Sequence, residues 1–178
     1  GGIQSMDGPS AEKAFKEKLI FPWQKVPFFF KPIYDGSTQP KTELVFDVPS
    51  VRIGGKGSLL NIITGLQSVI DWANSAGRGW YDGDKLIFLH NDEVGKTIVE
   101  NVDERWNVQK KCLAQGNGRW IHGLTLHTST VGEMEKKGGI AFFNQCKKSH
   151  YQKRNPNGQT YSGLYNLFIP ADDGLEGF

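Results

Sequence analysis

The stretch from Lys85 to Glu93 constrains the fold more than any other part of the chain. Residues 86–89 are apolar, and the stretch ends in two adjacent carboxylates, Asp92 and Glu93. A short apolar run of this kind is typical of a strand in a parallel sheet whose two faces are both covered. Because open α/β sheets bind ligands at the carboxyl ends of their strands, we expect the two acids to lie at a functional edge.

A second strand-like stretch, residues 119–127, is followed directly by Thr128, Ser129 and Thr130. If the two strands are neighbours, the acids and the hydroxyls meet at one edge of the sheet. In phosphoryl transfer one acid holds a magnesium ion and the next orients the attacking water. Hydroxyls on the neighbouring strand can then sense the γ-phosphate. The alternative is a solvated loop after one strand and an ordinary turn or helix cap after the other.

No segment of the chain fits the part of such a site that grips phosphate. The pattern G-x-x-x-x-G-K-[ST] is absent. Residues 54–58 are glycine-rich but precede no long helix, so they predict a hairpin loop. The run Gly95-Lys96-Thr97 has His90 where the motif requires glycine.

Basic residues suggest two further contacts. Arg78 lies between glycines in a predicted loop and could reach a phosphate, although an ordinary surface arginine is the alternative. Residues 136–154 carry six cations and no acid, with Tyr151 among them, which suggests a DNA-backbone patch or simply a solvated basic surface. The predicted DNA contacts are Lys147, Lys148, Lys153 and Arg154.

Three histidines near the acids raise the possibility of a metal site. They are His90, His122 and His127. Five residues separate the last two on one strand, so they point to opposite faces of the sheet. A zinc ion shared by these histidines is therefore not expected.

Strands that alternate with helices in the second half predict an α/β fold with a mostly parallel sheet, in a single domain spanning residues 1–178. Helices are predicted from Ser10 to just before Phe21, over 101–115 and over 140–148. Residues 27–32, bounded by two prolines, are predicted to be extended. Strands are predicted for residues 1–5, 42–48, 59–63, 69–72, 85–90, 119–127 and 162–169.

Composition excludes some classes of protein. No apolar run approaches the roughly 20 residues of a membrane helix, and the net charge of +2 is too small to indicate nucleic acid by itself. Two cysteines in no metal-ligand spacing suggest reduced thiols in a cytosolic compartment. The chain begins with Gly, inside a predicted strand, which predicts a piece excised from a longer protein.

With both motifs described, the chain resembles the large terminase subunit of tailed bacteriophages, the motor that packages DNA into the capsid. Residues 86–93 are similar to its Walker B segment, and residues 124–130 to the segment that couples hydrolysis to movement. Residues 2–5 and the following helix resemble the core strand after the phosphate-binding helix. Residues 77–79 match the position of a basic turn before Walker B.

The resemblance implies a RecA-like P-loop ATPase sheet that lacks the P-loop strand and carries a β-hairpin insertion. Asp92 would then coordinate Mg²⁺, Glu93 would be the catalytic carboxylate, and Arg78 would assist. Thr128, Ser129 and Thr130 would couple ATP hydrolysis to movement. The implied partners are double-stranded DNA, the portal, the small terminase subunit and further copies of the chain, in the host cytoplasm. Without a phosphate loop, this piece alone should not turn over ATP.

Two other functions fit the same residues. A metal-dependent nuclease or hydrolase would use Asp92, Glu93 and a histidine, and it requires at least three protein ligands converging near Asp92. A non-catalytic α/β module would associate with itself through an exposed sheet edge.

Overall fold

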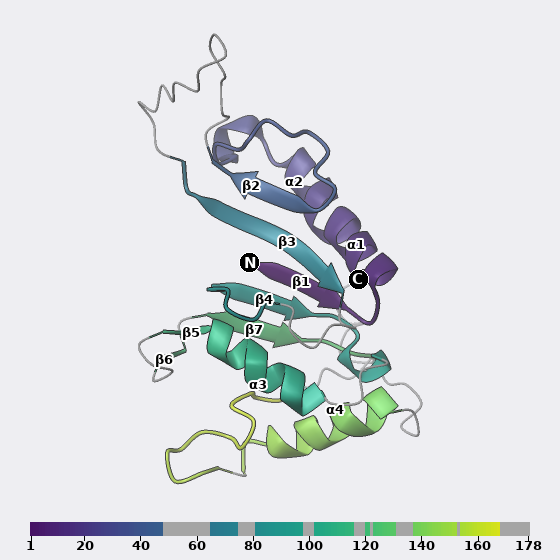
Figure 1. Cartoon of the computed structure of the whole chain (residues 1–178), viewed down its shortest axis with the longest axis vertical. Helices are drawn as coiled ribbons and strands as arrows, with labels where there is room; N and C mark the ends of the chain where they lie inside the picture. Colours follow the sequence, from purple (N-terminus) through teal and green to yellow (C-terminus); the bar gives the residue numbers. More distant parts are fainter. Residues whose placement is uncertain are drawn as a thin grey trace, which may run out of the picture.

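The computed structural model describes residues 1–47, 65–74, 81–97, 102–115, 120–121, 123–130, 137–152 and 154–167. Within them, five strands form one mixed sheet in the order β2-β3-β1-β4-β7 (Figure 1). β3, β1, β4 and β7 are parallel neighbours, and β2 runs antiparallel to β3. The strands are β1 (Gly2–Ser5), β2 (Glu43–Phe46), β3 (Ser68–Asn74), β4 (Phe88–Asn91) and β7 (Leu124–His127).

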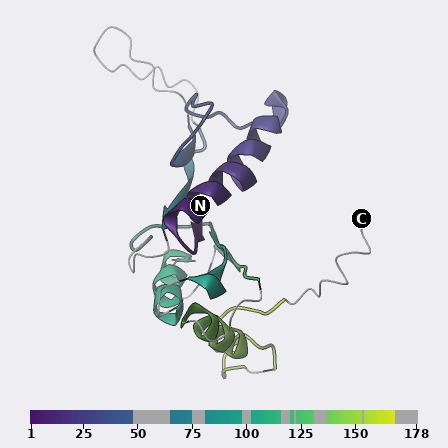
Figure 2. The ribbon, with the colours of Figure 1, turned by 90° about the vertical axis from the view of Figure 1, so that its right-hand side faces the viewer.

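One face of the sheet is covered by a helical run that comprises α1 (Gly8–Ala14), the π-helical η1 (Phe15–Ile20) and α2 (Phe21–Lys25). Figure 2 shows these three pieces as one continuous helix beside the sheet. Its apolar stripe buries Phe15, Ile20 and Trp23 against Ile3 of β1 and Leu44 of β2. This packing places the run over β1 and β3.

The run differs from prediction at both ends. Asp7, not Ser10, caps it by accepting a 2.7 Å hydrogen bond from the Ser10 amide. It continues past Pro22 to Lys25, because the amide of Phe21 already bonds to the Lys16 carbonyl in the wider π-helical register. Pro22 has no amide hydrogen, and it therefore enters where the hydrogen-bond ladder is interrupted.

The opposite face is covered by α3 (Val102–Cys112), whose Trp106 and Cys112 pack against Leu89 of β4 and Ala73 of β3. α4 (Lys137–Lys148) packs on α3 and on the short 3₁₀ turn η3 (Val94–Lys96) that follows β4. The sheet is thus a central layer between two helical layers.

The prediction of an α/β fold with a mostly parallel sheet is confirmed, and so are strands near 1–5, 42–48, 69–72 and 85–90. The single strand predicted over 119–127 is divided at Gly123 into β6 (Trp120–Ile121), which pairs with β5 (Ala114–Gln115), and β7. A side chain at Gly123 would overlap Leu113, so the chain changes sheet at a residue without one.

Two other local predictions are wrong. Residues 162–167 form no strand, because side-chain hydrogen bonds turn the chain there. The Ser162 hydroxyl bonds to the Ser149 hydroxyl and accepts from the Leu164 amide, and the Thr160 hydroxyl donates to the Leu164 carbonyl. Phe28–Phe30 form a 3₁₀ turn, η2, and not an extended segment, since the Phe30 amide donates to the Pro27 carbonyl. The strand predicted at 59–63 and the loop at 54–58 lie outside the described residues.

The helical run leaves part of its own face of the sheet bare. Phe88 of β4 is 39% exposed, and Leu124 and Leu126 of β7 are 67% and 48% exposed. These side chains lie on the same face of the sheet as Ile3. Ile3 is in register with His90, and His90 is in register with Leu126. Phe88 and Leu124 lie two residues before His90 and Leu126, so they point to the same face. Among the described strands, none pairs with the outer edge of β7. No helix in the described ranges has both the length and the apolarity needed to cross a membrane.

Replacing Leu89 by Ala should lower the free energy of unfolding by about 2–5 kcal/mol, because a fully buried leucine leaves a cavity. Leu124→Ala makes the same change at an exposed position of the neighbouring strand and should cost no more than about 0.5 kcal/mol. Urea denaturation measures both. Equal losses would mean that the two faces of the sheet have been assigned wrongly.

Candidate functional site

β4 and β7 end side by side, and their polar tips meet. Asn91 is in register with His127, and backbone hydrogen bonds continue past the strand ends, from the Thr128 amide to the Asn91 carbonyl at 2.9 Å and from the Val94 amide to the Thr128 carbonyl at 3.1 Å. The two acids and the three hydroxyls therefore lie at one edge, as expected from the sequence. Their chemical roles stay a prediction.

Asp92 has a distinct partner on each carboxylate oxygen. The Thr128 hydroxyl donates to Oδ1 at 2.9 Å, and the ammonium of Lys18, from η1, lies 3.1 Å from Oδ2. Burial by itself would raise the pKa of Asp92, but the hydrogen bonds from Lys18 and Thr128 outweigh it and hold the pKa below its ordinary value. Asp92 is thus an ionised carboxylate at neutral pH.

A histidine completes a chain of hydrogen bonds to this acid. His90 Nε2 lies 2.9 Å from Thr128 Oγ1. Since Thr128 gives its only hydroxyl proton to Asp92, it accepts from His90, so His90 carries its proton on Nε2. Burial, opposed by the charge of Asp92 and aided by that of Lys18, lowers the pKa of His90. A neutral imidazole therefore fixes the orientation of the Thr128 hydroxyl.

Glu93 has an unusual backbone. Its φ of 54° and ψ of 42° place a residue with a side chain in the left-handed region, a conformation that costs roughly 1–2 kcal/mol. Lys96 lies 3.1 Å from its carboxylate, and the Thr130 hydroxyl contacts the same group at 3.3 Å. Such strain is concentrated at functional sites, where the surrounding structure enforces it.

The loop that carries Glu93 is held by close packing. The Ser129 hydroxyl accepts from the Gly95 amide at 3.1 Å, and a side chain at Gly95 would crowd Ser129 and Phe142. On α4, Gly138 faces the backbone of Thr97 so closely that a Cβ there would overlap the Thr97 carbonyl. Because Gly95 and Gly138 have no side chains, α4 packs in direct contact with the backbone of residues 95–97.

A network of buried polar side chains is hydrogen-bonded to the last residues of β4 and β7. Asn91 Nδ2 donates to Gln109 of α3 and to His127 Nε2, both at 3.0 Å, and Gln109 donates in turn to Gln4 of β1. His127 Nδ1 lies 3.2 Å from the side-chain oxygen of Gln145 on α4. Because Asn91 donates to Nε2, the proton of His127 is on Nδ1. Burial lowers the pKa of His127 to about 4, so this imidazole is neutral.

Sequence reasoning identified the acids and hydroxyls but missed the partners that fix them. Lys18 is 74 residues from Asp92, and no local pattern marks it. The sequence suggests His90 only as a metal ligand, although its alternation with Asp92 along the strand indicates a shared face. The amide network gave no signal, because Gln and Asn carry none of the charge or metal-ligand patterns that mark a site.

The other predicted site residues are not part of this cluster. Arg78, Lys153 and His122 lie outside the described residues. Lys147 and Lys148 are the last two residues of α4, and their recorded partners are not the acids or hydroxyls of the strand tips. Lys148 pairs with Asp103, Lys147 lies 4.1 Å from the centre of the Phe143 ring, and Arg154 donates to the carbonyls of Tyr151 and Gly158.

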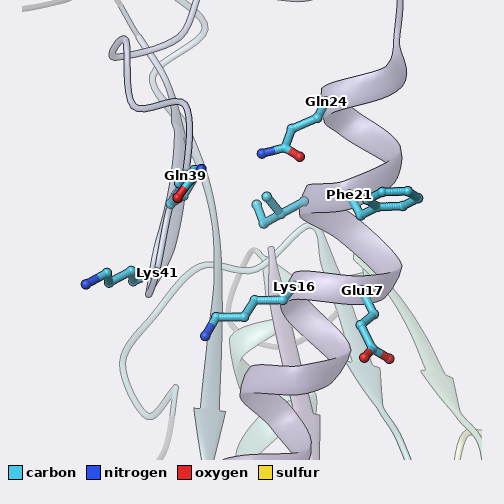
Figure 3. A pocket seen from close by; sticks show the side chains of 8 residues that line it. Lys16, Glu17, Phe21, Gln24, Gln39 and Lys41 are labelled. Carbon is cyan, nitrogen blue, oxygen red and sulfur yellow. The ribbon is translucent and has the colours of Figure 1, made fainter.

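A groove of about 500 Å³ lies between the helical run and residues 39–41 (Figure 3). Lys16 and Gln24 point toward the facing segment, whereas Glu17 and Phe21 project away from it. Its lining is mainly apolar and includes no residue of the strand tips. This groove is therefore separate from the site formed by Asp92 and Glu93.

Comparison with known proteins gives no relative: no family model, no curated protein and no solved structure matches the chain.

The left-handed backbone of Glu93 predicts how the free energy of unfolding responds to substitution. Glu93→Gly and Glu93→Ala both remove the carboxylate, but only glycine adopts this conformation without strain. The glycine variant should be more stable by about 1 kcal/mol in chemical denaturation. The same pair at Glu104, inside α3, should show the opposite order by about 1 kcal/mol. An alanine variant as stable as glycine at position 93 would contradict the strain.

The neutral state of His127 predicts a loss of stability in acid. Below the ordinary pKa of 6.5 the unfolded chain binds a proton that the folded chain excludes until about pH 4. The free energy of unfolding should therefore fall between these values, by about 3 kcal/mol from this group. Urea titrations across this range should show a shallower slope for His127→Gln, whereas His150→Gln should keep it. An unchanged slope in His127→Gln would refute the assignment.

Proposed function

We propose that the chain carries the metal-binding and water-activating half of a motor that hydrolyses ATP, similar to the ATPase of the large terminase subunit of tailed bacteriophages. In the complete motor, ATP hydrolysis would drive the translocation of double-stranded DNA, and this would take place in the host cytoplasm. One observation carries the proposal: a strained Glu93 directly follows an ionised Asp92 at the end of a central parallel strand, and both contact hydroxyls from the next strand.

The chemistry of Asp92 suits Mg²⁺. Mg²⁺ is usually held in phosphoryl-transfer enzymes by one or two carboxylates, with waters and substrate phosphates completing the shell. Asp92 is ionised and has a hydroxyl beside it. In the described residues no set of three His, Cys, Asp or Glu side chains could hold a metal ion. This arrangement favours an ion shared with phosphate over the nuclease alternative, which needs three protein ligands.

Glu93 is the residue we assign to water activation. Its carboxylate is the next acid after Asp92, and its contacts with Lys96 and Thr130 fix its position. A positioned carboxylate can orient the attacking water and accept its proton. Thr128 contacts Asp92 and Thr130 contacts Glu93, while Ser129 holds the Gly95 amide. A change at the acids would thus be transmitted to residues 128–130 directly, which is the coupling role proposed for them.

The exposed side of β7 supports the idea that the phosphate-gripping half docks there. Within the described residues its outer edge has no partner, and Leu124 and Leu126 are apolar and exposed beside it. An added parallel strand followed by a helix would pair with this edge and cover these side chains. We propose that a phosphate-binding loop between such a strand and helix would face Asp92.

The proposed DNA contacts remain Lys147, Lys148, Lys153 and Arg154, and the assisting arginine remains Arg78. The portal, the small terminase subunit and further copies of the chain are proposed as partners in the assembled motor. None of these proposals depends on the geometry of the strand tips.

A second candidate function is a module that associates with itself and has no catalytic role. The unpaired edge of β7 favours it, because open edges can pair with another chain. Three successive exposed aromatics, Phe28, Phe29 and Phe30, also favour it. This function predicts concentration-dependent dimers and no dependence of any property on the acids.

ATP turnover by the assembled motor that contains this chain tests the proposal. Glu93→Gln keeps the shape of the side chain but not its basicity, and it should lower kcat at least about a hundredfold. Glu43→Gln, on the edge strand β2, should leave kcat unchanged. A Glu93→Gln motor with wild-type turnover would exclude Glu93 as the catalytic carboxylate. The isolated chain should show no turnover, because its sequence contains no G-x-x-x-x-G-K-[ST] run to hold the phosphates.

A further inference from the structure

The ion pair of Lys18 with Asp92 joins two distant parts of the chain. Lys18 belongs to the helix that follows β1, and its ammonium lies 3.1 Å from Oδ2 of Asp92 at the tip of β4. The lysine side chain is 61% exposed, whereas that of Asp92 is 17% exposed. The carboxylate is therefore fixed in the site, and the ammonium is at the end of a long chain that reaches it from solvent.

The two oxygens of Asp92 have different freedom. Oδ1 accepts from Thr128, whose hydroxyl is oriented by His90, and both of these residues are themselves half-buried. Among the described residues, the flexible ammonium of Lys18 is the one hydrogen-bond partner of Oδ2. Oδ2 is thus the oxygen from which a cation can be exchanged without disturbing the hydrogen bonds of the strand tips.

We infer that Lys18 sets the affinity of this site for divalent cations, because its ammonium and a metal ion compete for Oδ2 of Asp92. The inference rests on the proposed function, which assigns the metal to Asp92. A bound Mg²⁺ lies about 2.0–2.1 Å from a carboxylate oxygen. An ammonium that kept its present contact would then be held close to a doubly charged ion. Lys18 therefore moves away when the metal binds, and the lost ion pair weakens metal binding.

The size of the effect follows from the exposure of the pair. Exposed ion pairs contribute little because water screens them, and the corresponding change in affinity is about twofold to fivefold. Salt screens exposed charges further, with a Debye length of about 3 Å at 1 M. The influence of Lys18 should accordingly be largest at low salt and almost absent at 1 M.

Titration of the chain with Mn²⁺ alone, followed by electron paramagnetic resonance of the free ion, tests the inference. Lys18→Met keeps the aliphatic stem and removes the charge, so it should bind Mn²⁺ about twofold to fivefold more tightly at low salt. Lys18→Arg keeps the charge and should bind like the wild type. Lys16→Met is the matched control on the same helix, where the lysine pairs with Glu12, and it should also leave the affinity unchanged.

Asp92→Asn separates the two hypotheses. If it abolishes Mn²⁺ binding while Lys18→Met binds like Lys16→Met, the metal assignment holds and the role of Lys18 is refuted. If Mn²⁺ binding survives Asp92→Asn unchanged, the metal assignment of the proposed function fails. Line broadening of the Thr128 and Asp92 amide resonances by Mn²⁺ locates the ion and confirms that each variant is folded. Broadening centred away from these residues would refute both.

Discussion

The parallel pairing of β4 with β7 is the interaction on which the rest of the structure depends. It joins segments that the chain separates by α3, and its hydrogen bonds run on past the strand ends to Thr128 and Val94. That continuation fixes the backbone on both sides of Asp92. Only then can hydroxyls from one strand reach the carboxylates of the other, and only then can η3 present a surface on which α4 packs.

Beneath the strand tips the core is polar and not apolar. Gln4, Asn91, Gln109 and Gln145 are each at most 2% exposed, and with His127 they connect β1, β4, β7, α3 and α4. Buried amides are unfavourable unless they are paired, and the Nε2 groups of Gln4 and Gln145 have no hydrogen-bond partner among the described residues. Apolar side chains could fill the same space, but they would not fix the relative positions of the neighbouring strand ends through directional hydrogen bonds.

The two helical layers differ in what they do for the site. α3 and α4 support the tips through the amide network and the close approach of Gly138 to Thr97. The helical run on the other face covers β1 and β3 and leaves Leu124 and Leu126 exposed. It also carries Lys18, whose ammonium forms an ion pair with Asp92. The chain thus combines a rigidly held acid pair with an adjoining exposed face and an unpaired strand edge. This combination is why we favour a motor half-site over a simple loop of acids.

The sequence by itself determined the α/β class, the strand that precedes the acids and the presence of two polar strand ends. These depend on local signals: apolar runs of strand length, glycines that end helices, and carboxylates that cannot be buried unpaired. The division at Gly123 and the left-handed Glu93 depend on neighbours outside their own segments, and the helical continuation past Pro22 depends on a change to π-helical hydrogen bonding that residue periodicity does not indicate. Lys18, His90 and the amide network likewise became partners of the tips only through strand order and facing, which a periodic pattern does not encode.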